Sequence, residues 1–325
     1  MNLSDIFIFL MVICWTALLP GGAKPSSAEA PAIFAPGVIS GPLHDSAPAF
    51  TPDGQTVYFG RSSAAGCTIL VSHLRRGQWS SPEIAPFSGE WSDLEPAMSP
   101  DGSFLIFVSN RPANSTGQPV SAFYNGKSYP GHGGNLWRVD RVAGGWGKPA
   151  RLPDSVNRSG SIFAPSVVRD GSVYFMEAMG EKGKFRLFRS QFSQGTWQQA
   201  QPVPFSDGTS TDVDPAVAPD ESFAVFGSGR APAKSMDLFI VFRRDGAWGQ
   251  PIHLGTEVNS PDSDAEPRLS PDGRTLYFSS ERVIPITYPR SLASARQDLK
   301  RMEQWDNGNY NIWQVPLSPW LNAHP

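Results

Sequence analysis

The stretch Asp264–Arg282 reads DAEPRLSPDGRTLYFSSER and predicts a β-hairpin. A short strand precedes a Ser-Pro-Asp-Gly turn, and a second apolar strand at 276–278 follows it. Pro271 presets φ at one turn position, and Gly273 takes a φ that other residues resist. Two β-rich runs around such a turn are typical of a hairpin.

The chain contains this hairpin five times. The prolines of the first strand are Pro48, Pro96, Pro165, Pro215 and Pro267, and by subtraction the steps between them are 48, 69, 50 and 52 residues. The turn aspartates are Asp53, Asp101, Asp170, Asp220 and Asp272, and the phenylalanines of the second strand are Phe59, Phe107, Phe175, Phe226 and Phe278. A second motif, Gly-x-Trp, begins at Gly77, Gly144, Gly195 and Gly246, with steps of 67, 51 and 51 residues. Two motifs that share one period indicate a structural repeat.

A period of about 50 residues with strand-like content is typical of a propeller blade of about four strands. The fifth unit lacks a Gly-x-Trp motif, and the segment 34–39 precedes the first repeat, where a fourth strand would lie. We therefore predict an all-β fold, a single five-bladed β-propeller of four-stranded blades. The N-terminal strand is expected to close the ring by joining the last blade, because closure removes an exposed sheet edge. A six-bladed ring is the alternative if the N-terminal segment or an insertion forms a blade.

The repeat phrase D-x-x-P-x-x-S-P-D-G-x-x-L-Y-F-x-S-x-R resembles the PD40 (WD40-like) repeat of TolB-type propellers. The resemblance covers residues 34–317 and implies a propeller fold, without the N-terminal domain that precedes the propeller in TolB. Three units depart from the phrase. The third has Ser161 and Ile162 where an Asp is usual and Arg169 in place of the turn Pro. The fourth has Glu221 in place of the turn Gly, and in the first Arg61 lies two places early, so we expect distorted turns in these units.

The chain divides into three parts. Residues 1–23 are expected to be a signal peptide, because 6–19 is almost wholly apolar and too short to span a membrane comfortably. Residues 24–33 should be a flexible lead-in, and 34–325 the β-propeller with insertions at 112–134 and 283–308. Apolar residues at helical spacing in the second insertion predict an amphipathic helix at 291–305, packed on the propeller.

Charge and cysteine content indicate which partners and which location to expect. The formal net charge of −3, with no basic stripe, argues against a nucleic-acid partner. After signal cleavage we expect no membrane span, a periplasmic or secreted location, and a monomer. Cys67 would then be the one remaining cysteine, without an internal disulfide partner.

Acidic residues recur at two positions of the first strand. Three residues before the motif proline lie Asp45, Asp93, Asp212 and Asp264, and one residue before it lie Glu95, Asp214 and Glu266. Alternation places both positions on one side of an extended strand, so the seven acids are expected to gather at one mouth of the channel. Such a ring would bind a hard cation such as Ca²⁺ or a basic peptide. Alternatively, these acids belong to the repeat itself and bind the backbone or the recurrent Arg111, Arg230 and Arg282.

Tyr124 and Tyr129 in the first insertion are candidates for stacking on a sugar, or else form a lid on the adjacent blade. The prediction is a non-catalytic binding or scaffold propeller that engages a protein, peptide or glycan partner in the cell envelope, with no cofactor unless Ca²⁺ occupies the acidic mouth. The alternative is a glycan-active hydrolase with two of these carboxylates as acid and base. No G-x-S-x-G or H-E-x-x-H motif supports another hydrolase chemistry.

Overall fold

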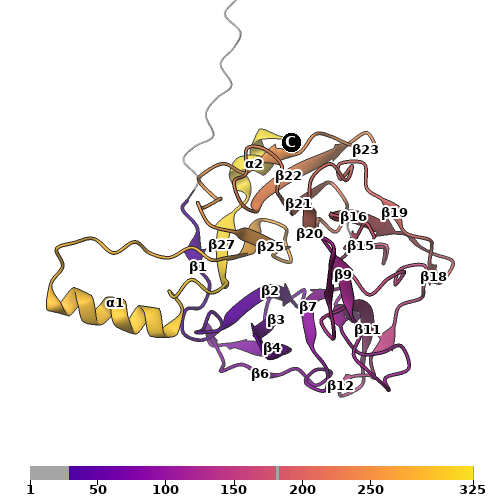
Figure 1. The fold of residues 1–325 in the computed structure, drawn as a ribbon, viewed down its shortest axis with the longest axis horizontal. Coiled ribbons are helices and arrows are strands. Elements are labelled where there is room, and N and C mark those ends of the chain that lie inside the picture. Colours follow the sequence, from indigo (N-terminus) through magenta and orange to yellow (C-terminus); the bar gives the residue numbers. More distant parts are fainter. Residues whose placement is uncertain (1–28, 181–182, 325) are drawn as a thin grey trace, which may run out of the picture.

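The computed structural model describes residues 29–180 and 183–324, and the predicted signal peptide at 1–23 lies outside them. Five antiparallel sheets surround one channel, which confirms the predicted five-bladed propeller (Figure 1). The innermost strand of each blade contacts the innermost strands of both neighbouring blades, and this closes the ring. Among the described residues, no helix is long and apolar enough to cross a membrane.

The repeated hairpin forms the two inner strands of every blade. The first strands are β2 (His44–Phe50), β7 (Asp93–Met98), β14 (Ile162–Val167), β20 (Asp212–Val217) and β25 (Asp264–Leu269). The second strands are β3 (Thr56–Ser63), β8 (Phe104–Ser109), β15 (Val173–Ala178), β21 (Phe223–Ser228) and β26 (Thr275–Ser280). We name the end of the channel where first strands begin the aspartate end, and the opposite end, with the Ser-Pro-Asp-Gly turns, the turn end.

The outer strands complete each sheet. The third strands are β4 (Gly66–Arg75), β11 (Asn135–Val142), β16 (Phe185–Ser190), β22 (Asp237–Arg244) and β27 (Asn311–Pro316). The short fourth strands of blades one to four are β6 (Glu83–Ile84), β13 (Ala150–Arg151), β19 (Gln201–Pro202) and β24 (Ile252–His253). The Gly-x-Trp motifs form small hairpins at the sheet margins, through β5 (Gln78–Trp79), β12 (Gly145–Trp146), β17 (Phe192–Ser193), β18 (Thr196–Trp197) and β23 (Ala247–Trp248).

An N-terminal strand closes blade five, as predicted, although it lies two residues earlier than the predicted 34–39. Strand β1 (Ala32–Ile33) pairs antiparallel with β27, and the Phe34 amide donates to the carbonyl of Ile312 at 2.8 Å. The residues that follow turn tightly, with Gly37 at φ 75°. Phe34 and Ile39 therefore leave the sheet and fill the core between blades five and one.

Each pair of neighbouring blades buries one hydrophobic cluster. The five second-strand phenylalanines predicted from the repeat are fully buried in these clusters. Helix α2 (Ser318–Ala323) follows β27 and packs Trp320 and Leu321 against the cluster of blades four and five. The core therefore lies between the blades and not inside any one of them, so no blade is expected to be stable alone.

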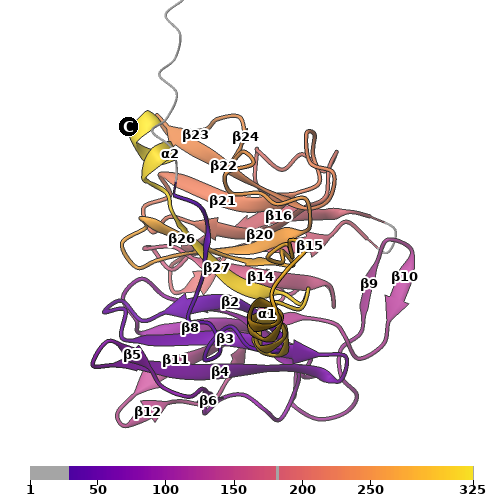
Figure 2. The same cartoon turned by 90° about the vertical axis from the view of Figure 1, so that its left-hand side faces the viewer.

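Both insertions follow a second strand, so both emerge at the aspartate end (Figure 2). The first forms a hairpin of β9 (Ala122–Tyr124) and β10 (Lys127–Tyr129). The second contains helix α1 (Leu292–Gln304), which Ser291 caps by accepting the Ser294 amide at 3.0 Å. The prediction that this helix packs on the propeller is wrong, because none of its residues is buried and it projects from the ring (Figure 1).

The distorted turn expected in the fourth unit is not observed. The Glu221 amide donates to the Ala218 carbonyl at 2.8 Å, as the Gly54 amide does to Thr51 in the first unit. Glu221 adopts the left-handed φ of 58° that glycine takes in the other turns. Its carboxylate accepts hydrogen bonds from Tyr174, Arg189 and Arg243, and these hold the strained residue in place.

Candidate functional site

Four of the predicted acids form one repeated ion pair at the aspartate end. The side chains of Asp45, Asp93, Asp212 and Asp264 are fully buried. Each carboxylate binds an arginine within two residues of the end of the second strand of its own blade, at 2.6 to 3.0 Å; these are Arg61, Arg111, Arg230 and Arg282. Each first strand is thereby joined to the second strand of its own blade at this end.

The same carboxylates also hold the loop that enters the blade. Asp45 accepts the Gly41 amide at 2.7 Å, and Asp264 accepts the Ser260 amide at 2.6 Å. Burial raises the pKa of Asp45 and Asp93, and their arginine partners oppose that shift. All four carboxylates thus bind groups of the protein itself, as expected from the alternative that these acids belong to the repeat. Whether they also bind a ligand stays a prediction.

Blade three lacks this ion pair, and the first insertion takes its place. Ile162 stands where the other blades have Asp, and Ser161 precedes it. The Ser161 hydroxyl accepts the Phe123 amide at 2.8 Å and donates to the Phe123 carbonyl at 3.0 Å. The hairpin β9–β10 of blade two is thereby attached to the start of blade three, next to the position of the missing aspartate.

The other three predicted acids meet inside the channel. Glu95, Asp214 and Glu266 each occupy a β-bulge with φ between 48° and 53°. A bulge breaks the strict alternation of side chains along the strand, so these side chains do not lie on the same side as the aspartates two residues earlier. The Glu95 carboxylate accepts the Ala164 amide at 2.6 Å, and the Asp214 carboxylate accepts the Glu266 amide at 3.1 Å. Each of these two acids therefore links its own blade to the next one.

Burial dominates the electrostatics of this group. It raises the pKa of Glu95 to about 8 and that of Asp214 to about 7, and the mutual repulsion of the three acids adds to the shift. Arg268 lies near enough to oppose both shifts. Near neutral pH, Glu95 and Asp214 therefore hold a proton for much of the time.

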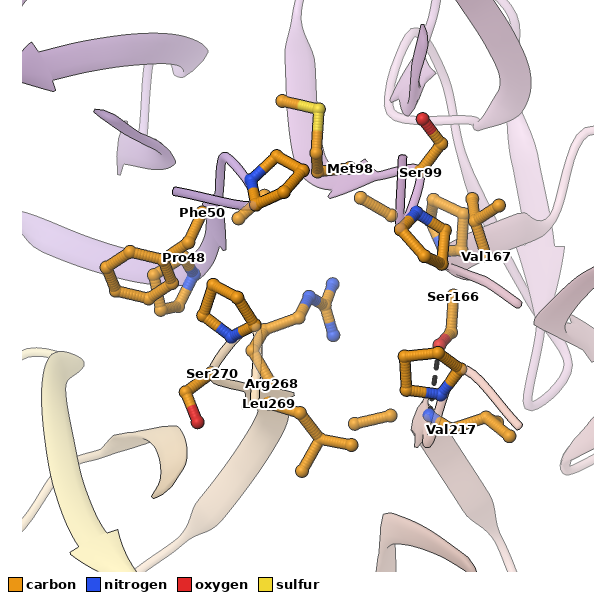
Figure 3. A pocket seen from close by; sticks show the side chains of 18 residues that line it. Pro48, Phe50, Met98, Ser99, Ser166, Val167, Val217, Arg268, Leu269 and Ser270 are labelled. Carbon is orange, nitrogen blue, oxygen red and sulfur yellow. Dashed lines mark hydrogen bonds between the residues drawn. The ribbon is translucent and has the colours of Figure 1, made fainter. Parts of the chain in front are cut away.

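Arg268 was not predicted as a site residue, although the repeat alignment marks it. It occupies the position after the motif proline. The four other blades carry small residues there, namely Ala49, Ala97, Ser166 and Ala216. These side chains leave a cavity of about 150 Å³ at the turn end, and the Arg268 guanidinium points into its centre (Figure 3). None of the seven predicted acids lines this cavity.

The two predicted tyrosines lie together on the hairpin of the first insertion. The rings of Tyr124 and Tyr129 stack at 4.3 Å between centroids, and Tyr124 also contacts Phe185 of blade three at 5.0 Å. The hairpin thus covers part of blade three, as expected if it forms a lid on the adjacent blade. A sugar that stacked between the two tyrosines would have to separate rings that already stack on each other. Sugar stacking on this pair stays a prediction.

No group of three or more His, Cys, Asp or Glu side chains within 29–180 and 183–324 is arranged to hold a metal ion. Arg268 lies near the buried acids, and its positive charge lowers the pKa of Glu95 and of Asp214. The Ca²⁺ ion that an acidic mouth would suit stays a prediction.

The fold is shared with known propellers of different function. The chain is similar to a putative TolB from Agrobacterium tumefaciens, with 16% identity and a TM-score of 0.49 over 85% of this chain and 91% of that one. A thermostable family-43 glycoside hydrolase matches with 12% identity and a TM-score of 0.50, over 84% and 89% of the two chains. TolB from Acinetobacter baumannii matches with 14% identity and a TM-score of 0.47 over 84% of this chain, which spans 54% of that protein.

Likeness at identities this low concerns the fold alone and gives no evidence about the ligand. No protein-family profile matches the chain, and no curated protein is significantly similar to it in sequence. The PD40 assignment of the repeat therefore stays a prediction.

Proposed function

We propose that the chain is a non-catalytic binding propeller of the PD40 type, exported to the cell envelope, which engages a protein partner with its aspartate end. The observation that carries the proposal is the distribution of exposed apolar side chains. Nine of the eleven exposed large hydrophobic residues among the described residues lie in segments at this end: Leu43, Phe123, Met179, Val283, Ile284, Tyr288, Leu292, Leu299 and Met302.

Apolar side chains that gather on one face of a soluble protein commonly mark a protein interface. Leu292 on α1 is 67% exposed and Tyr288 is 71% exposed, so water contacts most of each residue in the free chain. A groove of about 700 Å³ between blades one and two opens near the same end, and its lining includes Leu43, Trp91 and Glu90. An apolar centre with a polar margin is the usual composition of such an interface.

The alternative function, a glycan-active hydrolase, has weaker support from the geometry. A glycosidase needs an acid and a base that both reach the glycosidic bond. Glu95 has the raised pKa that suits a catalytic acid. However, the cavity at the turn end does not contact it, and the four mouth aspartates are bound to arginines.

Affinity capture from an envelope extract tests the proposal. The immobilised chain is compared with a variant in which Leu292, Leu299 and Met302 are replaced by glutamine, since none of these side chains supports the core. The matched control replaces Val142, which is 48% exposed and, as the last residue of β11, lies away from the aspartate end. We expect the α1 variant to lose the captured protein and the control to retain it. Equal capture by both variants would contradict the proposed surface.

Two further measurements address export and catalysis. Mass spectrometry of the native protein shows whether residues 1–23 are removed, as a signal peptide requires. A panel of chromogenic glycosides, assayed with the wild type and with Glu95→Gln, addresses the hydrolase. Turnover that disappears in the Glu95→Gln variant would favour the alternative function.

A further inference from the structure

Arg268 combines deep burial with unused hydrogen-bonding capacity. The residue is 6% exposed. Its Nη1 donates to the carbonyl of Pro267 at 2.8 Å, while Nε and Nη2 have no hydrogen-bond partner among the described residues. A buried donor without an acceptor is unfavourable, and more so on a charged group. Such an arrangement is uncommon in folded proteins and calls for an explanation.

The neighbouring carboxylates do not satisfy these donors. Glu95 and Asp214 each accept a backbone amide of the next blade, and Glu266 accepts the hydroxyl of Ser279 at 2.8 Å. None of the three hydrogen-bonds to Arg268, although all lie in the adjacent layer of the channel. Burial raises the pKa of Glu95 to about 8 and that of Asp214 to about 7, so proton uptake by these two acids lowers the negative charge of this layer near neutral pH.

The two free donors define the chemistry of the acceptor. Nε and Nη2 lie along one edge of the planar guanidinium, and this edge forms two parallel hydrogen bonds with a carboxylate. Arg268 is also the one long side chain among five equivalent positions, so the repeat does not account for it. The guanidinium therefore presents two adjacent donors that no described protein group accepts, in the geometry that suits a planar, singly charged group.

The walls of the cavity define the rest of the ligand. Proline rings and the side chains of Phe50, Met98, Val167, Val217 and Leu269 surround the guanidinium (Figure 3). A cavity of about 150 Å³ has room for a ligand of roughly the size of benzene. Pro52 and Pro271 belong to the lining and are exposed, so the cavity opens to solvent at the turn end.

We propose that the turn end of the channel is a binding site for a small apolar monocarboxylate, which Arg268 holds through Nε and Nη2 while the proline-lined walls enclose its apolar body. Two sources supply this chemistry, a free short-chain or aromatic acid and the C-terminal residue of a peptide. The site lies at the opposite end of the channel from the proposed partner surface, so either proposal can fail without the other.

Ligand-observed NMR titrations with benzoate test the proposal, with benzamide as the neutral isostere. We expect benzoate to bind the wild type and benzamide to bind at least about tenfold more weakly, because the charge-assisted fork is the main polar contact. A peptide that ends in a free valine and its C-terminal amide form the second arm. Competition of the free-acid peptide with benzoate would identify a peptide terminus as the source, and its absence would identify a free acid.

Variants separate the site from the fold. Arg268→Met removes the fork and should abolish benzoate binding, whereas Arg268→Lys keeps the charge and should weaken it. Ala216→Met keeps Arg268 but fills the cavity, and blade five shows that this position accommodates a long side chain. It therefore provides the same readout if Arg268→Met does not fold. Equal binding of benzoate and benzamide, or tighter binding of inorganic phosphate, would overturn the proposal, as would benzoate binding that Ala216→Met leaves unchanged.

Discussion

Replacing Asp264 with alanine is expected to destabilise the whole ring. The buried carboxylate accepts the Ser260 amide at 2.6 Å and the Arg282 guanidinium at 2.7 Å. In the variant, Arg282 stays largely buried between the rings of Phe278 and Trp313 without its counter-charge. Removing one partner of a buried ion pair costs about 3–5 kcal/mol, and the released Ser260 amide adds to the loss.

Urea unfolding followed by tryptophan fluorescence measures this change. Asp264→Asn should lose less, because its amide oxygen still accepts the Ser260 amide. The control is Asp140→Ala, which removes an ion pair of the same residue types, Arg138 with an aspartate that is 55% exposed. Exposed pairs contribute about 0–1 kcal/mol, so the control should unfold near the wild-type midpoint. If Asp264→Ala also unfolds there, the ion pair is not architectural, and a ligand-binding role for these acids gains support.

Three further predictions follow from the channel and the ring closure. Glu95→Gln should be as stable as the wild type near pH 4.5 and more stable than the wild type as the pH rises to about 8. The pKa of Glu95 is raised in the folded state, so the wild type must take up a proton to fold in this pH window and loses stability as the pH rises, whereas the variant does not. The difference should reach several kcal/mol at most, at about 1.36 kcal/mol per pKa unit, and urea titrations at both pH values measure it. Ala164→Gly should be neutral or stabilise by up to about 1 kcal/mol, since Ala164 holds φ at 52°; a clear loss in thermal unfolding would contradict this. A chain that begins at residue 34 should melt earlier and self-associate in light scattering, relative to one that begins at 29, because the loss of β1 exposes the edge of β27.

The fold was predictable because two motifs share one period and because every second strand carries a phenylalanine that must be buried. The same reasoning located the strand that closes the ring, but not to the residue. Phe34 looked like part of a strand, and in the structure it fills the core at the turn after β1. The apolar side chain of Phe34 predicts that the residue is buried. It does not predict whether the backbone of Phe34 belongs to a strand, because that depends on which residues of β27 pair with the segment.

The candidate site was harder to predict, for physical reasons. A β-bulge at Glu95 leaves no mark in the sequence, because Ala47 and Ala164 adopt the same left-handed φ in other blades. Helical spacing in α1 correctly predicted the helix, yet spacing alone does not tell whether the apolar stripe packs on its own chain or faces solvent. Arg268 was visible in the aligned repeats, but only a structure shows that Nε and Nη2 have no hydrogen-bond partner in the described part of the chain.

The repeat itself separates architecture from function. A side chain that occurs in nearly every blade, such as Asp93 with Arg111, solves a problem that every blade shares, namely how to join its entering loop to its second strand. A ligand, in contrast, breaks the symmetry of the ring and requires residues that differ between blades. In the channel, the blades differ at Arg268. At the aspartate end, they differ where Ser161 binds the inserted hairpin. Substitutions at such unequal positions should change binding while the fold persists, whereas substitutions at the equal positions should change stability first.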